Sequence, residues 1–125
     1  MAKKGLSIKR LFKSFGYAFK GIYQMIITEQ NAKVHTFAAC CVVVAGFYFR
    51  ISSFEWISII MLIAGVLAAE IFNTSIEALS DKVSPEYSES IKKVKDFAAG
   101  GVLLMAIAAV IVGLIIFVPK VIACF

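Results

Sequence analysis

The chain has 125 residues, of which 61% are apolar and 17% charged, and a formal net charge of +5. The apolar fraction far exceeds the ~45–50% of soluble domains. A soluble chain of this length would leave much of that apolar surface in water. The composition therefore excludes an ordinary soluble protein and predicts one all-α integral membrane domain over residues 1–125.

The N-terminal segment, at about residues 6–28, has the pattern of an amphipathic helix. When its residues are placed about 100° apart, most of the apolar side chains fall within one arc, and Lys9, Lys13 and Lys20 lie on the opposite side. A soluble helix would need a partner domain to cover that apolar face. We expect instead a helix on the membrane surface, with its lysines toward anionic headgroups.

Three later segments are predicted to cross the membrane, at about residues 33–50, 54–81 and 92–118. No charged residue occurs in 97–118, a run of 22 residues that exceeds the ~20 needed to span the hydrocarbon. The first two apolar stretches are shorter. They span the bilayer only if their polar ends continue the same helices into the headgroup layer.

Basic residues predict the orientation of these spans. Eleven lie before the first span or between the second and third, and only Arg50 and Lys120 lie on the other side. Basic loops stay on the cytoplasmic side. We therefore expect the N-terminus and the 82–96 loop in the cytoplasm and the C-terminus outside.

The second span ends in a polar stripe. Glu70, Asn73, Thr74, Glu77 and Asp81 fall on one side of the expected helix. A solvated helix end explains Asp81, but Glu70 would lie about 16 Å deeper along the axis, where an ionisable group is costly and usually marks a site. Carboxylates with an amide suit a hard divalent cation and leave one carboxylate as a general base.

Further charged residues lie at the same membrane face. Glu29 precedes the first span, and Lys95 and Asp96 begin the third. Metal-bridged phosphates, a cation and a base are the parts that phosphoryl transfer requires. An ion or proton channel and a structural membrane subunit are the alternatives, although a channel explains only Glu70. No nucleic-acid partner is expected, and Gly16 to Gly21 lacks the Lys and Ser/Thr of a P-loop.

From Arg10 to about Val118, the chain resembles the small trimeric prokaryotic diacylglycerol kinases, which include the undecaprenol kinases of Gram-positive bacteria. The motif E-x-x-N-[ST]-[AS]-I-E-x-x-x-D is present as Glu70 to Asp81. The loop Ser84 to Tyr87 and the Lys95-Asp96 pair, followed by small residues, support it.

The resemblance implies an ATP- and Mg²⁺-dependent lipid kinase in the bacterial inner membrane, with its active site on the cytoplasmic side. It also implies a homotrimer with active sites between subunits. Glu70 would be the general base, with Asn73 and Lys95 also at the reacting centre. Magnesium on the ATP phosphates would be held by Glu29 and Glu77. The nucleotide would also be contacted by Arg10, Tyr17, Glu86, Tyr87, Lys95 and Asp96.

Two positions depart from the enterobacterial pattern. His35 stands where those enzymes tend to carry an acidic residue, and Ser88 stands where they have histidine. The run from Glu29 to His35 is more similar to the Gram-positive branch, which favours undecaprenol over diacylglycerol as the lipid. A purely local hydrogen bond at the helix end is the alternative interpretation of His35.

Overall fold

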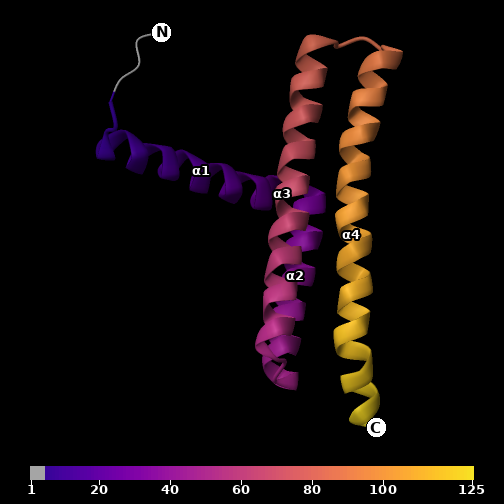
Figure 1. Ribbon diagram of the computed structural model, residues 1–125. Coiled ribbons are helices and arrows are strands. Elements are labelled where there is room, and N and C mark those ends of the chain that lie inside the picture. The colour runs from indigo at the N-terminus through magenta and orange to yellow at the C-terminus, as the bar shows by residue number, and fades with distance from the viewer. Residues whose placement is uncertain (1–4) are drawn as a thin grey trace.

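The computed structural model describes residues 5–125, which form helices α1 (Ile8–Thr28), α2 (Gln30–Phe49), α3 (Ser53–Val83) and α4 (Glu89–Ala123). The predicted all-helical fold is confirmed. Figure 1 shows α3 and α4 side by side and antiparallel, with α2 alongside α3 and α1 projecting sideways from the bundle. Lys3 and Lys4, which contribute to the predicted charge bias, lie outside the described range.

Helices α2, α3 and α4 are each long and apolar enough to cross a membrane. At about 1.5 Å per residue, the 20 residues of α2 span about 30 Å, the thickness of the hydrocarbon. The 31 residues of α3 and the 35 of α4 are longer than one crossing needs. Both continue past the level at which α1 leaves the bundle (Figure 1). The chain is therefore a multi-pass membrane protein.

A tight turn joins α2 to α3. Arg50 caps α2 in the left-handed conformation with a φ of 52°, and its backbone N–H bonds to the last carbonyls of the helix. Helix α3 then starts with a capping box, in which the Ser52 hydroxyl accepts from the Glu55 N–H and the Glu55 carboxylate accepts from the Ser52 N–H. These two caps fix the antiparallel register of α2 and α3.

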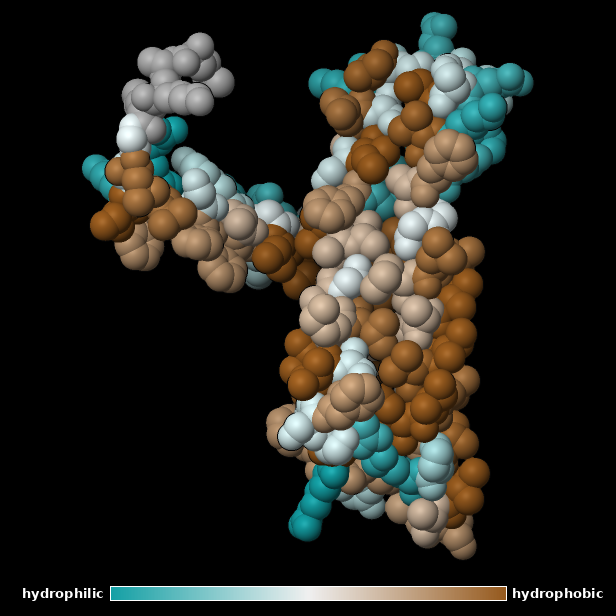
Figure 2. Space-filling view, viewed as in Figure 1, coloured by the Kyte–Doolittle hydropathy of each residue, from teal (hydrophilic) through white to brown (hydrophobic). Residues whose placement is uncertain are grey.

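A small buried core lies near this turn. Ile51, Ile59 and Ile116 form a buried apolar cluster there. At the same end, Lys120 of α4 forms an ion pair of 2.8 Å with Glu55 of α3. Figure 2 shows brown apolar side chains over much of the middle of the bundle and teal polar ones at its two ends, as expected for helices surrounded by lipid.

Candidate functional site

The site is centred on a carboxylate inside the bundle. Glu70 of α3 is only 2% exposed, and its Oε2 atom has no hydrogen-bond partner among residues 5–125. The Nε2 atom of His35, on α2, lies 3.8 Å from that oxygen. A buried carboxylate is strongly disfavoured unless another group compensates its charge. A structural role alone therefore does not explain why this carboxylate is buried.

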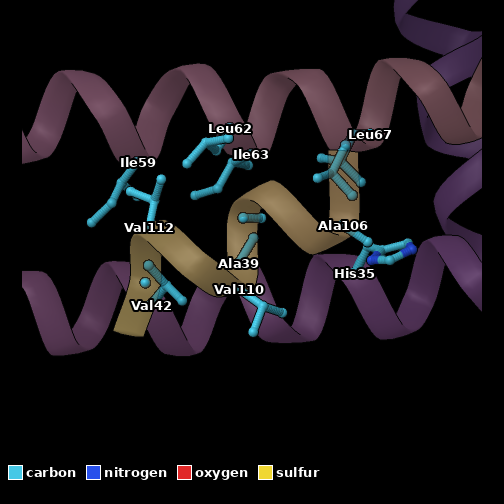
Figure 3. Close-up of a pocket in the computed structure, with 13 residues that line it drawn as sticks. His35, Ala39, Val42, Ile59, Leu62, Ile63, Leu67, Ala106, Val110 and Val112 are labelled. Atoms are coloured by element: carbon cyan, nitrogen blue, oxygen red, sulfur yellow. The ribbon is translucent and has the colours of Figure 1, made fainter. Parts of the chain in front are cut away.

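An apolar cleft leads away from this pair between α2, α3 and α4. Its volume is about 190 Å³, and His35 is its one strongly polar lining residue. In Figure 3, His35 lies at one end of the cleft, and Val42, Ile59 and Val112 lie at the other. The remaining lining residues are aliphatic or glycine: Ala39, Leu62, Ile63, Val66, Leu67, Ala106, Ala109, Val110 and Gly113. The cleft can hold part of a hydrocarbon chain whose polar end lies beside His35, the neighbour of Glu70.

One turn further along α3, the polar stripe continues with Asn73 and Glu77. Asn73 is 7% exposed, and its Nδ2 donates to Oε1 of Glu77 at 3.2 Å. Its Oδ1 atom is buried and has no partner within the described chain. Glu77 itself is exposed. The stripe thus runs from a buried carboxylate to an accessible one.

At the far end of the stripe, α3 and α4 are joined by an ion pair between Asp81 and Lys95. Asp96 pairs instead with Lys92 on its own helix at 2.6 Å, and both of these side chains are more than half exposed. Exposed pairs of this kind contribute little to stability. Lys95 and Asp96 are therefore available to a bound anion or cation with little loss of stability.

Glu29 lies at the junction of α1 and α2 and faces α3. It is half-buried and lines a shallow cleft together with Met25 of α1 and Ile71, Thr74 and Ser75 of α3. The junction thus brings Glu29 to the level of the polar stripe, as the sequence predicts.

The donor atoms at this level are suited to a hard divalent cation. Glu29 and Glu77 carry carboxylate oxygens, and Oδ1 of Asn73 has no hydrogen-bond partner within residues 5–125. No group of three or more His, Cys, Asp or Glu side chains that could hold a metal occurs in the described part of the chain. Magnesium is commonly bound by one or two carboxylates together with substrate phosphates, so these residues fit a metal that arrives on a nucleotide.

Four of the predicted nucleotide contacts lie apart from this centre within one chain. Arg10 and Tyr17 are exposed on α1, which projects away from α3 and α4 (Figure 1). Glu86 and Tyr87 are exposed in the connection between α3 and α4, at the end of the bundle beyond α1. The single chain does not bring these side chains together.

His35 is the residue whose placement sequence reasoning missed. The alternative interpretation was a local hydrogen bond, whereas the side chain contacts Glu70 on another helix. A signal was present, because His35 and Glu70 lie about 16 and about 19 residues from Ile51 in the turn. Antiparallel helices joined by a tight turn place such residues at similar depth, within about 5 Å along the axis.

The fold and the site together define a multi-pass membrane protein with a buried carboxylate next to the histidine that lines one end of an apolar cleft. The chain matches the family of prokaryotic diacylglycerol kinases over residues 16–117. It belongs to that family and is a lipid kinase.

Proteins similar to this chain are named either undecaprenol kinase or diacylglycerol kinase. The chain is 41% identical to the undecaprenol kinase of Bacillus subtilis over 113 residues, which cover 90% of this chain and 92% of that one. It is 36% identical to a diacylglycerol kinase of Synechocystis over 110 residues, which cover 87% of this chain and 63% of that one. It is 30% identical to the diacylglycerol kinase of Escherichia coli over 111 residues, which cover 89% of this chain and 91% of that one.

Proposed function

We propose that the enzyme transfers the γ-phosphate of magnesium-bound ATP to the hydroxyl of a membrane lipid, and that undecaprenol is preferred over diacylglycerol. The observation that carries this proposal is the burial of Glu70 next to His35, which lines the polar end of an apolar cleft. A lipid chain in the cleft would present its hydroxyl to a carboxylate that can act as a general base.

The lining of the cleft supports a prenol. Apart from His35, its lining side chains offer no hydrogen-bond donor. A prenol brings one hydroxyl and no further oxygen atoms. Diacylglycerol brings two ester carbonyls, and a site built for it would be expected to pair them with donors. The name of the relative from Bacillus subtilis points to the same lipid.

The phosphate donor would bind at the accessible end of the stripe. Glu29 and Glu77 would hold magnesium on the ATP phosphates, and Lys95 would face the charge that develops on the transferred group. A metal held there would supply positive charge that offsets the negative charge of the phosphates. Asn73, whose Oδ1 is unpaired in the described chain, would support the reacting centre.

Helix lengths support a position of Glu70 at the membrane boundary. Ser53 begins α3, and Glu70 follows about 17 residues later, or about 26 Å along the axis. The hydrocarbon core is about 30 Å thick. Helix α1 leaves the bundle near this level and exposes Phe12, Phe15 and Phe19, which supports a surface helix with these rings in lipid.

We also propose a homotrimer in the bacterial inner membrane, with the N-terminus and active site in the cytoplasm. The charge bias supports the orientation. Support for the trimer comes from α1, which carries Arg10 and Tyr17 and projects away from α3 within one chain (Figure 1). A neighbouring subunit would bring them to a nucleotide.

A competition assay tests the lipid. Purified enzyme would be given equal mole fractions of undecaprenol and diacylglycerol in mixed micelles with labelled ATP and magnesium. We expect a higher kcat/KM for undecaprenol, and loss of both activities in the Glu70→Gln variant. Without magnesium, we expect no phosphate transfer to either lipid. A clearly higher kcat/KM for diacylglycerol would overturn the lipid assignment.

A further inference from the structure

The buried carboxylate of Glu70 requires a group that holds it in place. Its side chain is 3% exposed, and Oε2 has no hydrogen-bond partner within residues 5–125. A carboxylate in this situation is unfavourable as an anion, and its unpaired oxygen requires an explanation. A base must be both charged and aimed, so a further residue has to supply these properties.

His35 is the basic side chain next to this carboxylate. Its Nε2 lies 3.8 Å from Oε2 of Glu70, and no other Lys, Arg or His of the described chain comes within 4.0 Å of it. The separation is slightly longer than a hydrogen bond, which needs about 2.7–3.2 Å. A hydrogen bond therefore requires these two atoms to approach by about 0.6–1.1 Å.

The surroundings of His35 differ from those of Glu70. The imidazole is 25% exposed, whereas the carboxylate is 3% exposed, and the imidazole lines the apolar cleft. Figure 3 shows it at the end of the cleft, with Leu67 of α3 and Ala106 of α4 labelled nearby. His35 thus borders both the carboxylate and the space that an acceptor lipid would fill.

We infer that His35 is a positioning residue, which holds the Glu70 carboxylate toward the polar end of the cleft through a hydrogen bond from Nε2. This inference rests on the proposed role of Glu70 as the base. In the transfer step, the lipid oxygen forms a bond to the γ-phosphorus, and the bond from that phosphorus to the β–γ bridging oxygen breaks. The hydroxyl proton passes to Glu70, and ADP leaves. His35 keeps its own proton throughout.

A double-mutant cycle tests the inference, using wild type, His35→Leu, Glu70→Gln and the double variant in detergent. We expect His35→Leu to lower kcat by about 10–100-fold, the usual range when the partner of an active-site ligand is removed. The KM for ATP should not change. Because His35 acts through Glu70, the double variant should be no slower than Glu70→Gln alone.

Two further variants separate positioning from packing. His35→Gln keeps a donor at about the reach of Nε2 and should recover most of the lost kcat. Val34→Ala changes an exposed neighbour of His35 on α2 that does not line the cleft, and it should leave kcat unchanged. Unfolding temperatures in detergent identify folded variants, and His35→Ala, which also removes the donor, replaces His35→Leu in the cycle if the latter does not fold.

Some outcomes would overturn only the role of His35, and another would remove the proposed base as well. Unchanged kcat in His35→Leu, no recovery in His35→Gln, or a further loss of kcat in the double variant would overturn the role of His35 while the kinase assignment stands. Wild-type kcat in Glu70→Gln would instead remove the proposed base, and the inference with it.

Discussion

Replacing Asn73 by leucine should stabilise the protein and inactivate it. The side chain is 7% exposed, and its Oδ1 has no partner in the described chain. Removing a buried unpaired polar atom recovers about 1–3 kcal/mol, whereas the lost hydrogen bond to Glu77 costs about 1 kcal/mol. Exposed Glu77 can bond to water instead. We expect a net gain of about 1 kcal/mol, or about 3–5 °C in Tm for a chain of this size.

The assay pairs thermal unfolding in detergent with single-substrate kinetics. Asn73→Leu should raise Tm and lower kcat by at least about 10-fold, since the amide would no longer support the reacting centre. Thr36→Val is the matched control, because the Thr36 hydroxyl is also buried without a partner in the described part of the chain. It should raise Tm with kcat unchanged. A lower Tm together with normal kcat in Asn73→Leu would refute the reasoning, because the amide would then serve the fold.

Three further predictions follow from the site, the turn and the charge bias. Glu77→Gln should raise the KM for magnesium-ATP and abolish most turnover. Glu70→Gln should leave nucleotide binding nearly intact and lower kcat by about 10²–10⁴, as measured by steady-state kinetics and nucleotide titration. Near-normal turnover in Glu70→Gln would contradict the assignment of the base. Gly46→Ala should lower Tm in detergent, because the added Cβ would lie 2.7 Å from Cη2 of Trp56. Overpacking costs about 1–3 kcal/mol, whereas the gain in helix propensity is about 1 kcal/mol. An unchanged Tm would show that the Trp56 ring moves away without cost. A reporter fused after Phe125 should be active outside the cytoplasm, and a cytoplasmic signal would contradict the three-span topology.

The helices could be predicted from local patterns. An uncharged run of 22 residues indicates α4, and the polar turn after Phe49 separates α2 from α3. The stripe on α3 follows from helical periodicity alone, and the structure shows Glu70 buried and Glu77 exposed. These features could be predicted because periodicity describes one helix at a time.

Contacts between helices were harder to predict. The pairs His35 with Glu70 and Lys95 with Asp81 depend on the depth and rotation of two helices at once. Apolar spans give little information on rotation, because their lipid-facing and protein-facing sides are both hydrophobic. Residue counts from the turn at Arg50 restrict depth but not rotation. The apolar cleft arises from three helices together and had no pattern of its own.

The extra length of α3 gives the enzyme access to two phases. Beyond Glu70, α3 continues for about 13 residues to Val83, or about 20 Å along its axis. ATP would be dissolved in water and the acceptor lipid in the membrane, and the two substrates would meet along α3. The rate should then follow the surface density of the lipid rather than its total amount. Adding inert detergent at constant lipid would slow turnover, and adding more vesicles of fixed composition would not raise the rate per occupied enzyme.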